Sequence, residues 1–181
     1  MHSAVIGLAG PIGSGKTSVA QGVANALNCS IASFGTYVRE VAVRSERGTS
    51  RDVLQGISEQ LLDILGAREL TRKVLASVAW DREHSLVVDG IRHPDVVTAL
   101  KAEADPLPVI IVYLDVSPDL RRSRLITRDN LSAWELDGFE LHATERDVGT
   151  RIRALADFVV TADGELEAVV AAVIHTIESR S

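Results

Sequence analysis

An eight-residue stretch, Gly10-Pro11-Ile12-Gly13-Ser14-Gly15-Lys16-Thr17, constrains the fold more than any other part of the chain. It fits the pattern G-x-x-x-x-G-K-[S/T], in which glycines let the backbone curl until several N–H groups point at phosphate oxygens. An apolar run, 4–9, precedes it, and a helical pattern, 18–27, follows it. The N-terminus of that helix adds partial positive charge. The sequence therefore predicts a nucleoside triphosphate site between a strand and a helix.

Within this loop we expect Lys16 to reach the β- and γ-phosphates of ATP and the hydroxyl of Thr17 to ligate Mg²⁺. Asp89 ends a second apolar run, 86–88, which is where a carboxylate commonly holds Mg²⁺ directly or through water. The expected ATP-binding residues of the loop and helix are Gly10, Ile12, Gly13, Ser14, Gly15, Lys16, Thr17 and Ser18.

Apolar runs alternate with helical patterns along the whole chain. The expected strands are 4–9, 30–34, 86–88, 109–114 and 157–161. The expected helices are 16–27, 95–104, 118–128, 143–156 and 165–179, with a helical region at 36–80 that is broken near 47–50 and at Gly66. Continuous apolar strands separated by helices predict an α/β fold with a parallel sheet covered on both faces.

Composition limits the partners. A chain of 181 residues with 46% hydrophobic residues is long enough for one domain with a full core. The net charge of -6 argues against nucleic acid, which requires a basic surface. The single cysteine, Cys29, excludes an internal disulfide, and no apolar run reaches membrane-spanning length. We expect a cytoplasmic protein with a small-molecule partner, while the oligomeric state is not predicted.

Two arginines follow successive strands. Arg39 comes soon after the second strand, and Arg92 comes just after the third. Because ligands of open parallel sheets bind at the carboxyl ends of the strands, both arginines can converge with the phosphate loop. Two arginines beside a γ-phosphate are suited to an acceptor that is itself anionic.

Four segments resemble P-loop nucleoside monophosphate kinases and, more narrowly, the small dephospho-CoA kinase-like nucleotide kinases known largely from archaea. Residues 33–39 (SFGTYVR) resemble the acceptor-side segment that ends in Arg, and residues 49–55 (TSRDVLQ) resemble a Thr-Arg-Glu-Asn-Leu-Gln segment. Residues 88–94 (VDGIRHP) resemble the specific Asp-Gly-Ile-Arg-x-Pro segment, and 156–164 resemble an Ala-Asp-Tyr-Val-Ile…Asp-Gly ending. The resemblance covers nearly the whole chain.

This resemblance implies a three-layer P-loop NTPase fold with a five-stranded parallel sheet of order 2-3-1-4-5. It divides one domain, 1–181, into a core (1–35, 81–128 and 143–181), an acceptor-binding helical insertion at about 36–80 and a lid at about 129–142. It implies that Arg39, Arg51 and Arg92 bind the acceptor phosphate and that Gln55 touches the acceptor base or sugar. Phe34 either stacks on that base or belongs to the core. Asp163 and Gly164 are expected to line the donor adenine.

The helix expected at 118–128 carries a row of arginines. Arg121, Arg124 and Arg128 are spaced three and four apart, which places them on one face. Such a row on a closing lid supplies positive charge to a transferring phosphoryl group, so we expect Arg124 and Arg128 to be catalytic together with Lys16 and Arg92. The lid segment departs from the Gly-rich form expected in the group, since Trp134 and Phe139 lie in it. Further candidates are Arg146 and Arg151.

The acceptor is a phosphate or a hydroxyl. A hydroxyl acceptor, as in dephospho-CoA kinases, usually needs a carboxylate base. Alignment on Arg39 puts Ser33 and Gly35 where those acids would be, although Glu40 can still serve. A phosphate acceptor needs no base, which favours a nucleoside or deoxynucleoside monophosphate.

Two non-kinase classes compete with this reading. The chain has no Asn-Lys-x-Asp guanine motif, which disfavours a GTPase. An ATP-binding module that regulates a partner is the remaining non-kinase alternative, and it would use the phosphate loop but not the acceptor arginines.

Overall fold

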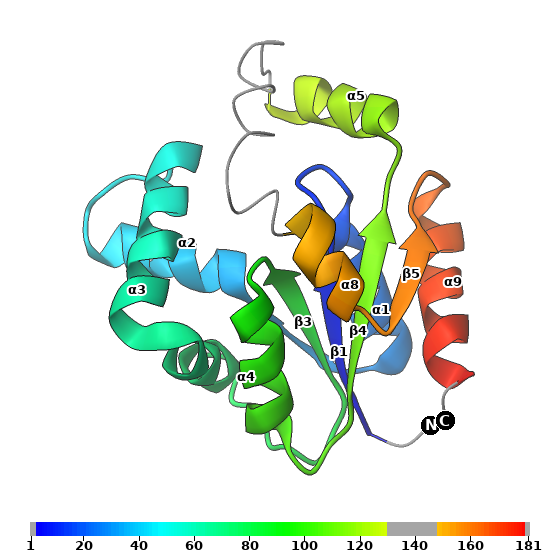
Figure 1. Ribbon diagram of the computed structural model, residues 1–181, viewed down its shortest axis with the longest axis horizontal. Coiled ribbons are helices and arrows are strands. Elements are labelled where there is room, and N and C mark those ends of the chain that lie inside the picture. Colours follow the sequence, from blue (N-terminus) through cyan, green and yellow to red (C-terminus); the bar gives the residue numbers. More distant parts are fainter. Residues whose placement is uncertain (1–2, 130–147, 180–181) are drawn as a thin grey trace.

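Five parallel strands form the centre of the protein in a computed structural model that describes residues 3–129 and 148–179. The strands lie in the order β2-β3-β1-β4-β5 (Figure 1), so the expected topology is confirmed. Their bounds are β1 Val5–Ala9, β2 Ser30–Ser33, β3 Leu86–Ile91, β4 Val109–Asp115 and β5 Phe158–Thr161. All of β1 and the first six residues of β4 are apolar and buried because both faces of the sheet are covered.

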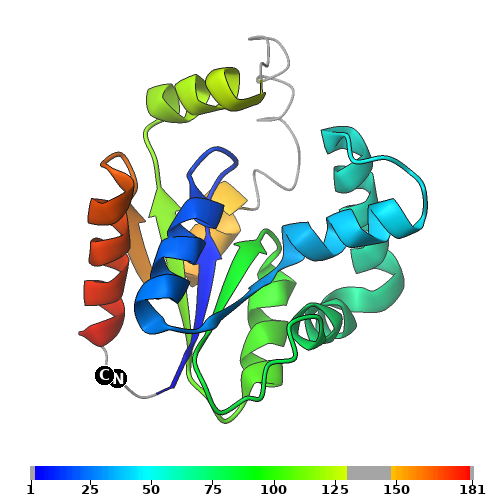
Figure 2. The ribbon, with the colours of Figure 1, turned by 180° about the vertical axis from the view of Figure 1, so that it is seen from behind.

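Helices form a layer on each side of the sheet (Figures 1 and 2). On one side α1 (Lys16–Leu27) and α9 (Leu166–Glu178) pack against each other and against the sheet, with Val23 and Val173 fully buried. On the other side lie α4 (Pro94–Ala104), the short helices η1 (Val148–Ile152) and α8 (Arg153–Leu155), and the end of α3. The sheet thus separates two apolar cores.

A helical arm follows β2 and projects from the core (Figures 1 and 2). It consists of α2 (Phe34–Arg44) and the first half of α3 (Arg51–Ala76), which pack on each other through a small cluster of their own around Val38 and Ile57. Gly66, with φ 73° and ψ 162°, breaks α3, and the second half turns onto the core. This confirms the expected interruptions of the 36–80 region.

The third strand differs from its prediction. β3 continues through Asp89 to Ile91, because Gly90 adopts φ 88° and bulges out of the register between Asp89 and Ile91. A residue with a side chain is strained at this angle. The bulge lets the strand bend toward α2 while Ile91 returns to the core.

The helix expected near the C-terminal part of the chain is described only in part. Of the helix expected at 143–156, residues 148–156 are described: η1 and α8 cover 148–155, and Ala156 ends the helix in an extended conformation. The expected lid at 130–142 lies outside the described residues. Among the described helices, none has the length and apolar character to cross a membrane.

Candidate active site

The phosphate loop joins β1 to α1 and folds around the side chain of Lys16. The Lys16 ammonium donates hydrogen bonds to the carbonyl oxygens of Gly10 and Pro11, both at 2.7 Å, and the side chain is buried. A Cβ on Gly10 would lie 2.7 Å from the carbonyl oxygen of Leu114, so the loop can run this close to β4 only with glycine there. The loop therefore holds a cation at the N-terminus of a helix, an arrangement that binds phosphate.

Thr17 and Asp89, the two residues expected to hold a metal, form a hydrogen-bonded pair. The hydroxyl of Thr17 donates to Oδ2 of Asp89 at 2.9 Å, and Asp89 is 5% exposed. Its other oxygen, Oδ1, is buried and has no hydrogen-bond partner among the described residues. A buried, unpartnered carboxylate oxygen is costly, and a cation would satisfy it.

The donor set fits Mg²⁺. The ion prefers oxygen ligands, keeps several waters and commonly takes one or two carboxylates plus substrate phosphates. In the part of the chain that is described, no group of three or more His, Cys, Asp or Glu side chains is arranged to hold a metal. Thr17 and Asp89 would hold the ion, with Asp89 acting directly or through water.

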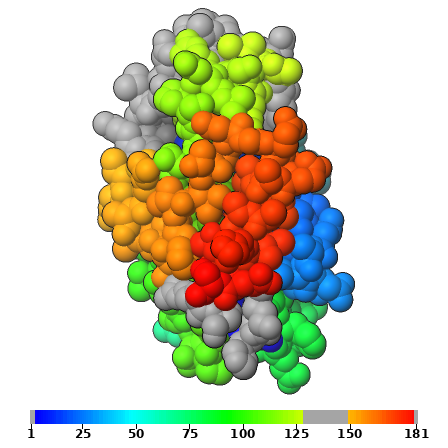
Figure 3. Space-filling model, turned by 90° about the vertical axis from the view of Figure 1, so that its right-hand side faces the viewer, coloured from blue at the N-terminus to red at the C-terminus, as the bar shows by residue number. Residues whose placement is uncertain are grey.

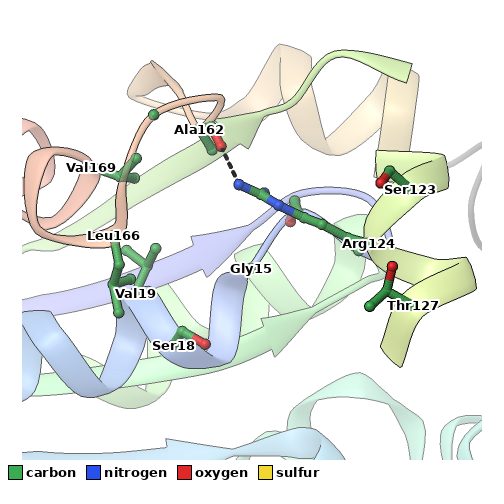
Figure 4. A pocket seen from close by; sticks show the side chains of 12 residues that line it. Gly15, Ser18, Val19, Ser123, Arg124, Thr127, Ala162, Leu166 and Val169 are labelled. Atoms are coloured by element: carbon green, nitrogen blue, oxygen red, sulfur yellow. Dashed lines mark hydrogen bonds between the residues drawn. The ribbon is translucent and has the colours of Figure 1, made fainter. Parts of the chain in front are cut away.

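A cavity of about 480 Å³ opens beside the phosphate loop. It lies between the start of α1, helix α5 (Pro118–Asp129) and the turn that joins β5 to α9 (Figure 4). Figure 3 shows the outer side of this region, where α5 lies above that turn and α9. The lining residues are Gly13, Ser14, Gly15, Ser18, Val19, Ser123, Arg124, Thr127, Ala162, Gly164, Leu166 and Val169. The mixture of apolar side chains, hydroxyls and one guanidinium can accept a nucleoside attached to the phosphates on the loop.

Helix α5 packs directly on the loop. A Cβ on Gly13 would lie 3.0 Å from Cγ of Leu125 and 3.1 Å from Cγ of Arg121. Arg124, one turn further, extends into the cavity and donates from Nη2 to the carbonyl oxygen of Ala162 at 3.2 Å (Figure 4). Its guanidinium thus bridges α5 and the turn after β5.

Of the other residues expected to bind the donor or to form the lid, only some are described, and only Gly164 lines the cavity. Gly164 lines the cavity, whereas the carboxylate of Asp163 accepts from the backbone N–H of Ser117 at 2.8 Å and ties the turn to the start of α5. Arg151 is exposed on η1. The expected contributions of the Arg128 side chain and of Trp134, Phe139 and Arg146 lie outside the described residues.

The residues expected to bind the acceptor lie at the ends of β2 and β3 and on the arm. Ser33 lies beside Asp89 in the parallel register, and its hydroxyl caps α2 by accepting from the backbone N–H of Thr36 at 3.3 Å. Arg92 follows β3 directly and is half-buried. Phe34 is 8% exposed and packs in the core next to Gly90, which favours a structural role for this ring.

The remaining acceptor candidates lie on the arm. Arg39 is exposed on α2, Arg51 is the first residue of α3, and Gln55 follows one turn later. Both α3 residues are half-buried. The acceptor candidates therefore come from three separate elements around the carboxyl ends of the strands.

Sequence reasoning missed one arginine at this edge of the sheet. Nη2 of Arg153 donates to Oδ2 of Asp115 at 2.8 Å, and its guanidinium lies 5.8 Å from the centre of the Tyr113 ring. Asp115 is the last residue of β4, so this pair lies at the same end of the sheet as the phosphate loop. Its only sequence signal was the position of Asp115 after an apolar run.

Comparisons with known proteins agree with this architecture. A family model described as "AAA domain" matches residues 9–138. A "UPF0200 protein" of Aeropyrum pernix is 29% identical over 164 residues, which cover 90% of this chain and 86% of that protein.

Among solved structures, the Mycobacterium tuberculosis APS kinase in complex with AMPPNP and APS is 17% identical, with a TM-score of 0.64 over 98% of each chain. Shikimate kinase from Aquifex aeolicus is 20% identical, with a TM-score of 0.57 over 97% of each chain. At these identities, the likeness concerns the fold.

Proposed function

We propose that this chain, which belongs to the AAA domain family, is a P-loop kinase that acts on a nucleoside or deoxynucleoside 5′-monophosphate. It transfers the γ-phosphoryl group of ATP to the acceptor phosphate and gives ADP and a diphosphate. One bond, between the γ-phosphorus and its bridging oxygen, breaks, and one bond from an acceptor phosphate oxygen forms.

The observation that supports a phosphate acceptor is the chemistry at the end of β2. Ser33 stands beside Asp89, where a hydroxyl acceptor would need a base, and its hydroxyl is already engaged as the cap of α2. Arg92 emerges from the neighbouring strand. A phosphate oxygen is already anionic and requires only cations to hold it.

In this proposal the phosphate loop and the Thr17–Asp89 pair bind the triphosphate of ATP. The Lys16 ammonium now donates to two loop carbonyl oxygens, and phosphate oxygens of ATP would accept hydrogen bonds from it in the bound state. Thr17 and Asp89 would hold Mg²⁺, and the bound ion would supply positive charge to the β- and γ-phosphates. Electrostatic stabilisation of the transferring group is then completed by Arg92 and Arg128.

Arg124 acts on the donor side in this proposal. Its guanidinium lies in the apolar cavity next to Ala162, where a nucleobase attached to the bound phosphates would be placed. A planar cation stacks well on an aromatic face. Sequence spacing alone suggested a transition-state role for this residue, whereas its position favours donor binding.

Transfer to a hydroxyl, such as that of dephospho-CoA, is the second candidate. The supporting observation is that Glu40 is one of the residues that line a small cavity together with Asp89. As a general base, the carboxylate of Glu40 would take the proton of the acceptor hydroxyl. A regulatory ATP-binding module would leave the acceptor-side arginines without a role.

Binding of the acceptor tests the main proposal. With Mg²⁺ and a non-hydrolysable ATP analogue present, calorimetry with each monophosphate should reveal one base that binds. Arg92→Ala should lose that binding and keep its affinity for the analogue. The control is Arg47→Ala, an exposed arginine of the arm that pairs with Gln60. Equal acceptor affinity in Arg92→Ala and wild type would remove Arg92 from the acceptor site.

A further inference from the structure

A second cavity, of about 260 Å³, is lined in part by Thr17 and Asp89, neither of which lines the first cavity. It is enclosed by α1, the end of β2, α2, the end of β3 and the residues just after α3. Its lining consists of Thr17, Ala20, Gln21, Ile31, Ser33, Thr36, Glu40, Ser77, Val78 and Asp89. At about 30 Å³ per water molecule, this volume has room for a hydrated ion.

The polar groups of this cavity are almost all oxygens. Two acidic residues, Glu40 on α2 and Asp89 on β3, line it together with four residues that carry hydroxyls: Thr17, Ser33, Thr36 and Ser77. Gln21 contributes a neutral amide, and no lysine, arginine or histidine belongs to the described lining. A phosphate would meet two like charges here, so the cavity is unsuited to the acceptor and suited to a hard cation.

Two details of the carboxylates support this reading. Asp89 is only 5% exposed, and its Oδ1 has no hydrogen-bond partner among the described residues. Glu40 is 47% exposed in its side chain and pairs with Arg44 of the same helix at 3.4 Å. An exposed pair one helical turn apart contributes little, so Glu40 can turn toward the cavity at small cost.

We propose that Glu40 is the second carboxylate of the divalent-cation site, and that Glu40 and Asp89 together bind hydrated Mg²⁺ before nucleotide arrives. In this state the ion keeps most of its waters, and the hydroxyls of Ser33 and Thr36 accept hydrogen bonds from them. The inference rests on the proposed function only in the choice of Mg²⁺. It gives a role to the polar side chains that line this cavity.

The test measures Mn²⁺ binding to nucleotide-free protein by electron paramagnetic resonance of the free ion, with Mg²⁺ as competitor. Wild type should bind one Mn²⁺ that Mg²⁺ displaces. Glu40→Gln should raise the Mn²⁺ dissociation constant about 10- to 100-fold, the range seen when residues that support metal ligands are removed. Asp63→Asn is the matched control, because it removes one negative charge from an exposed position of the same arm. Glu40→Asp should bind with intermediate affinity, and thermal unfolding monitors the fold of every variant.

Several results would overturn the inference. Wild type without an Mn²⁺ site in the absence of nucleotide would do so, as would Glu40→Gln with wild-type affinity. Glu40→Gln with unchanged Mn²⁺ affinity, but with transfer to a hydroxyl acceptor and its pH dependence lost, would make Glu40 a base instead. If no monophosphate acts as acceptor while Mn²⁺ binding still depends on Glu40, the proposed acceptor fails and this inference stands.

Discussion

Replacing Arg124 by alanine separates donor binding from catalysis. The guanidinium extends into the 480 Å³ cavity beside the phosphate loop and is fixed by a 3.2 Å hydrogen bond to the carbonyl oxygen of Ala162. Gly15 lies within reach, since a Cβ there would be 3.8 Å from Nη1 of Arg124. A nucleobase in this cavity would therefore contact the planar face of the guanidinium.

The expected loss of ATP affinity in Arg124→Ala follows from the contact between the guanidinium and the base. A cation stacked on an aromatic ring contributes about 0.5–2 kcal/mol, depending on how far the pair is removed from water. Arg124 is half-buried, so Arg124→Ala should weaken ATP binding about 3- to 30-fold, at a factor of ten for each 1.4 kcal/mol. The turnover number at saturating ATP should fall by less than the affinity does.

The assay is calorimetric titration of a non-hydrolysable ATP analogue with Mg²⁺, alongside steady-state kinetics. The control is Arg122→Ala, on the same helix but outside the cavity lining. ADP and ATP should lose affinity by similar factors, because the contact is with the base. Unchanged ATP affinity together with a turnover number lowered about 100-fold or more would refute this reasoning. It would show that Arg124 stabilises the transition state and does not bind the base of ATP.

Three further predictions concern other parts of the molecule. Lys16→Ala should lower turnover about 10²- to 10³-fold, because a preorganised charge next to the phosphates is lost; near-normal turnover would exclude the phosphate-loop assignment. Arg92→Ala should raise the acceptor KM about 10- to 100-fold at unchanged ATP affinity, measured by initial rates. Glu103 is 5% exposed, and the hydrogen bond from Arg68 at 2.6 Å, with further help from Arg72, holds the pKa of its carboxyl below the usual 4.5. Its charge therefore stabilises the fold above pH 4.5, and this contribution is lost as pH falls through the lowered pKa. Glu103→Gln should cost about 1–2 kcal/mol at pH 7, and thermal melts should show the difference from wild type shrinking in acid; a constant difference would contradict the assignment.

Much of the architecture was predictable because it depends on local patterns. The phosphate loop, the helix Lys16–Leu27 and the break at Gly66 follow from glycine positions and apolar periodicity. Thr17 and Asp89 lie 72 positions apart, and both were predicted as metal ligands because they occupy fixed places in a strand–loop–helix unit; the hydrogen bond between them is a finding of the structure. The sheet order came from the resemblance and was confirmed.

The remaining features depend on where side chains point, which spacing does not determine. Arg124 shares a helix face with Arg121 by spacing. It enters the cavity beside the phosphate loop because α5 crosses over Gly13 and because the carbonyl oxygen of Ala162 accepts its hydrogen bond. Strand β3 extends past its expected end because Gly90 bulges there, a consequence of tertiary packing against Phe34. The cavity that Glu40 lines arises between four elements and has no continuous sequence signature.

The most direct test of the central claim is a coupled assay of ADP release with ATP and Mg²⁺. AMP, CMP, GMP, UMP, their deoxy forms, dTMP and dephospho-CoA are each supplied as the sole acceptor. The account predicts that one monophosphate stimulates ADP release and is recovered as its diphosphate. Stimulation by dephospho-CoA alone, or a steady ATPase rate that ignores every acceptor, would contradict it.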